Sequence, residues 1–223
     1  MRSLIVFDLD GTLVDSSVDL ANAVNALLRE LGAAPIAVDD VVAMVGDGAA
    51  VLVRRALTAA RLDPETPGAL DRFLAHYDPH LLDNTSPYPG MIETLQELSQ
   101  RATLAVLTNK PSKATELVLS GLDMGRYFRE VIGGDTSWGR KPAPAGLLHI
   151  CEAAGARPPE TLLVGDSAVD LATARKAGTR ICLARYGFGF RFSGTAFRGD
   201  EQFIDSPAEL LELPELPELP KSP

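Results

Sequence analysis

Two carboxylates two residues apart follow a short apolar run near the start of the sequence. Residues 4–7 are apolar, and Asp8 and Asp10 come directly after them in the stretch "SLIVFDLDGT". A continuous apolar run of this length is typical of a strand that is covered on both faces of a parallel sheet. In open parallel sheets, ligands bind beyond the carboxyl ends of the strands. We therefore expect Asp8 and Asp10 to lie at a ligand site.

Polar residues also follow two later apolar runs, residues 104–107 and 162–164. The stretch "LTNK" ends the first of these runs, "GDSAVD" follows the second, and an isolated segment "GRKPAP" lies between them. Together with the first pair of acids, these segments predict one crevice at the sheet edge. Its further polar residues are Thr108, Asn109, Lys110, Lys141, Asp166 and Asp170.

Clustered carboxylates repel one another unless a cation neutralises them. A hard divalent ion that prefers oxygen ligands is therefore expected, with Mg²⁺ as the first choice. Such an ion usually shares its remaining positions with phosphate oxygens and water, while Lys141 and Thr108 supply charge and hydrogen bonds to the same phosphoryl group. These residues therefore predict phosphoryl chemistry.

The two acids of the first run suit different steps of that chemistry. A carboxylate can act as the nucleophile and form an aspartyl phosphate, and Asp8, at the rigid end of a strand, is best placed to do so. Asp10 is placed to protonate the leaving oxygen and then to take a proton from the attacking water. Gly11 and Thr12 would let the chain turn away without crowding the phosphate.

The same motifs also have structural interpretations. Asp-x-Asp-Gly begins calcium loops and Asx turns, but an EF-hand loop has glycine at its sixth position between helices. Here Gly11 is fourth and a strand precedes it. The "GDSAVD" segment is also typical of a capped helix start, and capping is compatible with metal binding.

The remaining pattern predicts an α/β fold with a parallel sheet and helices on both faces, in three layers. Strands are expected at 4–7, 104–107, 162–164 and 181–184, with a weaker one at 131–132, and helices at 91–98, 114–122, 145–154 and 171–177. Residues 16–86 interrupt this order with helical patterns alone. The domain prediction is a core of residues 1–15 and 87–213, an inserted helical cap of residues 16–86, and a flexible proline-rich tail of residues 214–223.

Composition limits the choice of partners and compartment. The 223 residues carry a net charge of −9, which argues against nucleic acid as the main partner. No apolar run approaches the ~18 residues of a membrane helix, and no secretory signal is evident, so we expect a cytoplasmic protein. Cys151 and Cys182 are expected to be structural thiols, and the three histidines to be structural or surface residues.

In this order, "DLDGT", "LTN", the lysine of "GRKPAP" and "GDSAVD" resemble the four signature motifs of the haloacid dehalogenase superfamily. The resemblance implies a Rossmann-like core with a small cap inserted after the first strand. It implies Asp8 as nucleophile, Asp10 as general acid and base, and phosphate binding by Thr108, Asn109 and Lys141. The implied Mg²⁺ ligands are Asp8, the backbone carbonyl of Asp10, and Asp166, with Asp170 in support. Dehalogenases lack the second acid, so Asp10 favours phosphate esters.

A closer resemblance to bacterial phosphoglycolate phosphatases extends over most of residues 1–213. It rests on "DGTLVDSSVDLANAVN", "MVGDGAAVLVRRAL", "LTNKP", "VIGGD" and "RYGFG". The implied reaction is the hydrolysis of 2-phosphoglycolate, a small phosphorylated substrate, to glycolate and phosphate. Related phosphatases for sugar phosphates, pyrophosphate and nucleotides share much of this pattern. A β-phosphoglucomutase-like phosphomutase and a phosphate-sensing protein on a haloacid dehalogenase scaffold are the alternatives from other classes.

The cap residues that would contact the substrate are less well defined by sequence. Backbone N–H groups at Gly46 and Gly48 are candidates for binding the substrate carboxylate, and Arg55 or Lys110 for pairing with it. Arg55 follows Arg54 on a helical pattern, and paired arginines commonly form a solvated face. The oligomeric state is expected to be a monomer or a homodimer.

Overall fold

The computed structural model describes residues 3–192 and 197–213, and its centre is a six-stranded parallel sheet. Strand β1, which carries the first acidic motif at its end, pairs with β4 on one side and β6 on the other. All strands predicted from the sequence are present, whereas the edge strand β8 was not predicted. In sheet order the strands are β5 (Glu130–Ile132), β4 (Ala102–Leu107), β1 (Ser3–Phe7), β6 (Thr161–Gly165), β7 (Arg180–Ala184) and β8 (Gln202–Ile204).

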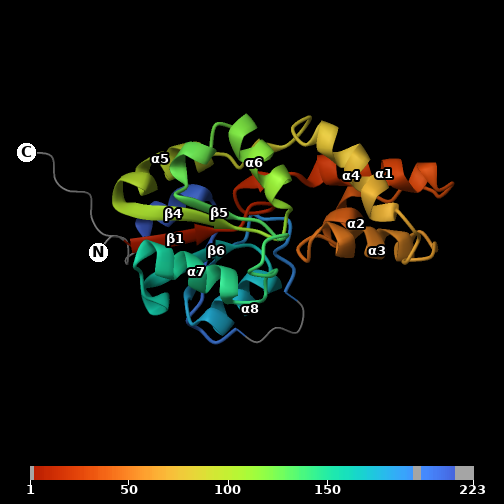
Figure 1. Ribbon diagram of the computed structural model, residues 1–223. Coiled ribbons are helices and arrows are strands. Elements are labelled where there is room, and N and C mark those ends of the chain that lie inside the picture. Colours follow the sequence, from red (N-terminus) through yellow and green to blue (C-terminus); the bar gives the residue numbers. More distant parts are fainter. Residues whose placement is uncertain (1–2, 193–196, 214–223) are drawn as a thin grey trace, which may run out of the picture.

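Helices cover both faces of this sheet (Figure 1). Alternate residues of β1 enter different cores: Ile5 and Phe7 belong to one buried cluster, and Leu4 and Val6 to the other. This burial on both faces explains the continuous apolar runs of the sequence. The predicted three-layer α/β architecture is confirmed. Its covering helices are α5 (Met91–Arg101) and α6 (Ser112–Gly121) on the first face, and α7 (Ala145–Ala154) and α8 (Ala168–Ala177) on the second.

The four α-helices within residues 16–86 lie to one side of the sheet in Figure 1. They pack around a shared apolar interior that includes Val24, Leu27, Leu57 and Phe73. These helices are α1 (Ser17–Glu30), α2 (Val38–Val42), α3 (Ala49–Ala59) and α4 (Ala69–Tyr77). The exact boundaries of a cap domain stay a prediction, and the tail of residues 214–223 lies outside the described residues.

Short elements complete the chain. Two-residue strands pair antiparallel where the chain enters and leaves the four helices, namely β2 (Val14–Asp15) and β3 (Ser86–Pro87). The 3-10 helices are η1 (Asp78–His80), η2 (Gly125–Tyr127), η3 (Pro158–Glu160) and η4 (Pro207–Glu212).

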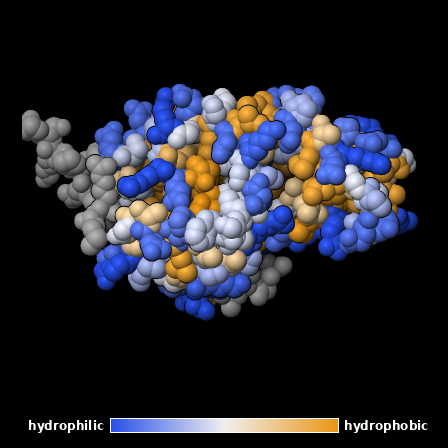
Figure 2. All heavy atoms as spheres, viewed as in Figure 1, coloured by the Kyte–Doolittle hydropathy of each residue, from blue (hydrophilic) through white to orange (hydrophobic). Residues whose placement is uncertain are grey.

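The surface, the helices and the two cysteines can be compared with what the composition predicted. Hydrophilic residues cover much of the face seen in Figure 2, with apolar patches between them. None of the helices in residues 3–192 and 197–213 has the length and apolar character that crossing a bilayer requires. Cys151 and Cys182 are both buried and are not joined in a disulfide, as predicted for structural thiols.

Asp19, in the first turn of α1, connects the segment that follows β2 with the segment that precedes β3. Its carboxylate is 2% exposed and accepts hydrogen bonds from the backbone and side chains of Asn84 and Thr85, at 2.8–3.1 Å. Burial by itself would raise the pKa of Asp19, but these hydrogen bonds outweigh it and lower the pKa below its usual value. The carboxylate therefore ties the start of the four-helix segment to its end.

We expect Asp19→Asn to lower the free energy of unfolding by about 2 kcal/mol at neutral pH, because an amide NH₂ would face N–H donors that now meet a carboxylate. Urea unfolding measures this difference. A carboxyl with a lowered folded-state pKa stabilises the fold above its unfolded pKa of about 3.9 and loses that contribution as pH falls through the folded pKa. The difference between wild type and variant should therefore shrink below about pH 4.

Asp71→Asn, an exposed change of the same charge in the first turn of α4, serves as the control and should alter stability by less than about 0.5 kcal/mol. If the two substitutions changed the free energy of unfolding equally, or if the effect of Asp19→Asn did not depend on pH, the stabilising role of Asp19 would be refuted.

Candidate functional site

Asp8 lies at the carboxyl end of β1, in the middle of the sheet. Its backbone N–H donates to the Val164 carbonyl at 2.9 Å, which continues the pairing with β6 and fixes the backbone here. Asp8 is only 8% exposed, and its Oδ1 accepts from the Leu9 N–H at 2.7 Å and lies 2.8 Å from Nζ of Lys141. Burial raises the pKa of Asp8 to about 6, and repulsion from Asp170 adds to this against the attraction of Lys141.

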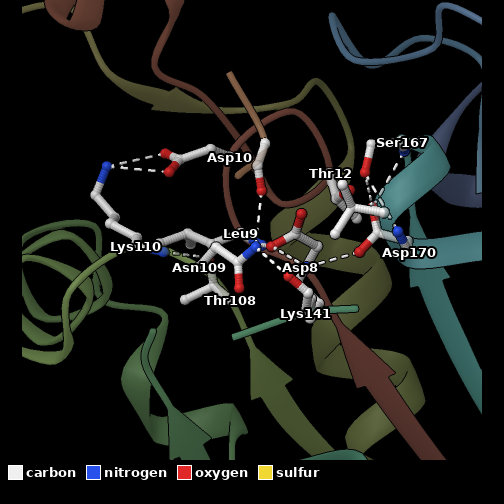
Figure 3. Close-up of polar contacts among 12 residues, drawn as sticks. Asp8, Leu9, Asp10, Thr12, Thr108, Asn109, Lys110, Lys141, Ser167 and Asp170 are labelled. Atoms are coloured by element: carbon white, nitrogen blue, oxygen red, sulfur yellow. Dashed lines mark hydrogen bonds and ion pairs between the residues drawn. The ribbon is translucent and has the colours of Figure 1, made fainter. Parts of the chain in front are cut away.

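Lys141 joins Asp8 to Asp170 from below in Figure 3. Its ammonium lies 2.6 Å from Asp170 Oδ1, and it is 4% exposed. Asp170 is held independently, because it forms a capping box with Ser167 at the start of α8. Capping and participation in the acidic site therefore coexist at Asp170. Burial opposes the charge of Lys141, but the two carboxylates outweigh it and raise the pKa of the lysine.

Asp166, at the end of β6, completes a group of three buried acids. Carboxylate oxygens of Asp8, Asp166 and Asp170 all lie within 4.8 Å of one another. Asp166 Oδ2 accepts from the Gly189 N–H at 2.7 Å. Burial, followed by repulsion from Asp170 and Asp8, raises the pKa of Asp166 well above its usual value. When all three acids are ionised, their negative charge exceeds the positive charge that Lys141 supplies.

This donor set fits a divalent cation such as Mg²⁺. It offers several hard carboxylate oxygens, and the raised pKa of Asp166 reflects negative charge that a cation would offset. Gly11 keeps the space beside Asp166 open. Its φ is +86°, and a Cβ at this position would lie 2.0 Å from Asp166 Oδ2. The side chain of Asp10 is not in this group, and its predicted contribution was the backbone carbonyl.

The Asp10 carboxylate lies beside the acidic group but has different partners (Figure 3). Its Oδ1 accepts from Ser16 Oγ at 2.7 Å, and its two oxygens lie 3.0 and 3.2 Å from Nζ of Lys110. The same ammonium donates to the Tyr77 hydroxyl at 2.5 Å. Burial opposes the charge of Lys110, but Asp10 and then Tyr77 outweigh it and raise the pKa of the lysine.

A cavity lies between the four-helix segment and the ends of β1 and β4. Polar and apolar residues share its wall. The polar lining consists of Asp8, Asp10, Thr108, Asn109, Lys110, Tyr77, Gly46 and Gly48, and the apolar lining of Leu20, Val45, Ala49, Leu52, Phe73, Leu74, Pro111 and Ala114. Residues from two of the four predicted motifs, the first acidic motif and the segment after β4, therefore meet a surface contributed by the four helices.

Thr108 and Asn109 line this cavity, and their side chains already have partners. Thr108 Oγ1 accepts from the Lys110 N–H at 3.2 Å. Asn109 Nδ2 donates to the Gly46 and Lys141 carbonyls, each at 2.9 Å, so that it links the loop before α3 to the lysine segment. A phosphate-binding role for either residue stays a prediction.

The predicted cap contacts fall in different places. Gly46 and Gly48 line the cavity, whereas Arg55 is not part of its lining. Arg55 donates to the Met44 carbonyl at 2.8 Å and pairs with Asp47 at 2.6 Å, so it braces the loop that carries the glycines. The three histidines pair with acids at partly exposed positions.

The sequence reasoning missed Ser16, Tyr77 and Gly189 as neighbours of the acidic residues. Ser16 follows the first motif closely enough to have been suspected, because a turn there returns it to Asp10. Tyr77 carries no such signal, since it reaches Lys110 only through the packing of α4 against the core.

Comparisons with known proteins agree with this geometry. Residues 5–184 match the model of the family described as haloacid dehalogenase-like hydrolase. The chain is 43% identical over 192 residues to phosphoglycolate phosphatase 1 of Pseudomonas aeruginosa, covering 83% of this chain and 70% of the relative. It is 39% identical over 215 residues to phosphoglycolate phosphatase of Chromobacterium violaceum, covering 94% and 95%.

Solved structures lead to the same family. A crystal structure described as a predicted phosphoglycolate phosphatase from Haemophilus somnus 129PT superposes with a TM-score of 0.87 at 33% identity, covering 95% of this chain and 97% of the other. A second, described as a putative phosphoglycolate phosphatase from Lactobacillus delbrueckii, gives a TM-score of 0.79 at 29% identity, covering 98% and 100%. With the acids and lysine of the four motifs assembled at one sheet edge, the chain belongs to the haloacid dehalogenase-like hydrolase family.

Proposed function

We propose that this hydrolase is a Mg²⁺-dependent phosphatase that converts 2-phosphoglycolate and water to glycolate and phosphate through an aspartyl phosphate on Asp8. The observation that carries the proposal is the placement of Asp8, whose Oδ1 is held by Leu9 and Lys141 beside the cavity that also receives Asp10. Relatives named phosphoglycolate phosphatase, about 40% identical over most of the chain, support the substrate.

In the first step, a carboxylate oxygen of Asp8 attacks phosphorus and the bond from phosphorus to the ester oxygen breaks. Oδ1 takes the contacts from Leu9 and Lys141, and the described residues give Oδ2 no hydrogen bond, which suits it to attack. The leaving oxygen takes its proton from the Asp10 carboxyl and departs as the hydroxyl of glycolate.

In the second step, water attacks the phosphorus of the aspartyl phosphate while Asp10, now a carboxylate, accepts the water proton. The bond from phosphorus to Asp8 breaks, which releases phosphate and restores both acids. Ser16 and Lys110 hold the Asp10 carboxylate in place for both proton transfers.

The remaining residues act on charge and position. Lys141 orients Asp8 and offsets part of the phosphoryl charge, and Thr108 and Asn109 bind at the phosphate end of the cavity. Asp8, the backbone carbonyl of Asp10, and Asp166 would hold Mg²⁺, with Asp170 in support. When bound, Mg²⁺ offsets the charge of the phosphate and of the acids.

We further propose that residues 16–86 act as a cap domain over this site. Its helices supply much of the apolar cavity wall, and Gly46 and Tyr77 bond directly to residues of the core. With the cap in this position, bulk water is kept from the phosphoryl group while the leaving group departs.

Asp8→Asn should lower kcat at least ~10⁴-fold, because the amide oxygen is a poor nucleophile. Release of inorganic phosphate from 2-phosphoglycolate measures this, and thermal unfolding checks that the fold persists. Asp71→Asn should keep wild-type activity. Phosphate release by Asp8→Asn that persists in a double variant with Asp10→Asn would come from a contaminant. Release that depends on Asp10 would contradict the nucleophile assignment.

Magnesium should stabilise the wild type by about 2.7 kcal/mol at a concentration 100 times its Kd, which is roughly 5–10 °C in Tm for a chain of this size. Asp166→Asn should lose most of this increase. Its Tm without metal should be no lower than that of the wild type, because the buried charge of Asp166 is unfavourable without a cation. A full Mg²⁺ response in Asp166→Asn would exclude the proposed ligand set, and Asp71→Asn should respond like the wild type.

A screen of phosphate release should give a kcat/KM for 2-phosphoglycolate at least about 10-fold above those for glucose 6-phosphate and pyrophosphate. Free phosphate as the product separates a hydrolase from a phosphomutase, which returns the phosphoryl group to its substrate. A higher kcat/KM for a sugar phosphate would reassign the substrate and leave the chemistry in place.

A further inference from the structure

Lys110 is the one cationic residue among those lining the cavity in the described part of the chain. Lys141, the other buried lysine of the site, lies outside the lining and binds Asp8 and Asp170. Figure 3 shows that Lys110 reaches Asp10 from the side away from Asp170. The positive charges of the site are therefore divided between two ends, with the acids Asp8 and Asp10 between them.

Lys110 and Tyr77 have donors left over. An ammonium has three N–H donors. Lys110 Nζ has three acceptors within reach, namely the two Asp10 oxygens at 3.0 and 3.2 Å and the Tyr77 hydroxyl at 2.5 Å. When one N–H is shared between the two oxygens of Asp10 and a second meets Tyr77, the third is left for a ligand. Tyr77 uses its oxygen to accept from Lys110, so its own hydrogen is available to donate, and burial raises its pKa to about 12, which keeps that hydrogen in place. Two donors therefore come together at one wall of the cavity.

We propose that Lys110 and Tyr77 together bind the carboxylate of the substrate, so that the enzyme selects phosphate esters whose leaving group is itself an anion. The proposal rests on the proposed function and adds Tyr77 as a specificity-determining residue. A carboxylate is an acceptor without donors and offers two oxygens, which suits one N–H of an ammonium and one phenolic O–H.

The surroundings strengthen this selection. Leu52 and Phe73 also line the cavity, and in such apolar surroundings a charged hydrogen bond is stronger than in water. A neutral leaving group would use neither the charge of Lys110 nor the full capacity of the Tyr77 donor.

The pair also joins two parts of the chain. Tyr77 is the last residue of helix α4, and Lys110 follows the sheet strand β4. The Tyr77 ring lies 5.5 Å from Phe73 between centroids, and Lys110 Nζ lies 4.7 Å from the centre of the Tyr77 ring. A carboxylate bound by both residues would hold α4 against the core during the reaction.

Tyr77→Phe tests the proposal with little disturbance, because it keeps the ring and removes the hydroxyl. The two substrates to compare are 2-phosphoglycolate and 2-hydroxyethyl phosphate, which replaces the carboxylate with a neutral hydroxymethyl group. Loss of a hydrogen bond to a charged group should lower the ratio of their kcat/KM values about 10-fold, mainly through a higher KM for 2-phosphoglycolate. Tyr127→Phe, at a tyrosine of η2 distant in sequence, should keep the wild-type ratio.

Lys110→Met should lower the ratio further and lower kcat for both substrates, because Asp10 also loses its partner, whereas Lys110→Arg should restore most of the ratio. An unchanged ratio in Tyr77→Phe, or an equal loss for both substrates, would overturn the carboxylate site. If the wild type shows no preference for 2-phosphoglycolate over the neutral ester, the proposed function fails. If the wild type has that preference and the variants keep it, only the role of Tyr77 and Lys110 fails.

Discussion

More negative than positive charge is buried at one edge of the sheet, and the arrangement of the site depends on this excess. Carboxylate oxygens of Asp8, Asp166 and Asp170 lie within 4.8 Å of one another, and the Lys141 ammonium pairs with Asp8 and Asp170. The raised pKa values of Asp8 and Asp166 show that burial and mutual repulsion disfavour their ionised forms. A site in which buried negative charge is unfavourable without a cation is well suited to bind one, and to a reaction that passes through charged phosphoryl states.

The fold provides rigid support for that concentration of charge. Asp8 ends a central strand that is paired on both sides, and Asp166 ends its neighbour. Asp170 belongs to a capped helix whose N-terminal dipole favours a carboxylate. Glycines make the close approach possible, since a Cβ at Gly165 would lie 2.3 Å from the carboxyl carbon of Asp170.

Sequence alone predicted the parts of the site that depend on the ends of apolar runs. Asp8, Asp166 and the segment after β4 could be placed because parallel strands end at the same edge. The edge strand β8 was missed, since its short stretch "QFI" carries no long apolar run. Residues whose partners arise from packing were also beyond reach: Tyr77 meets Lys110 across a distance of 33 residues, and Asn109 meets Gly46 across 63. These contacts join the four helices to the core, and such contacts leave no local pattern in the sequence.

The central claim is that Asp8 carries the phosphoryl group during turnover. The most direct test is to quench the enzyme with acid while it hydrolyses 2-phosphoglycolate, reduce it with borohydride and map the product by peptide mass spectrometry. An acyl phosphate is reduced under these conditions, so our account predicts homoserine at position 8, dependent on substrate and absent from Asp8→Asn. Unmodified Asp8 in an enzyme shown to be turning over at saturation, or homoserine at Asp10 or Asp166 instead, would contradict it.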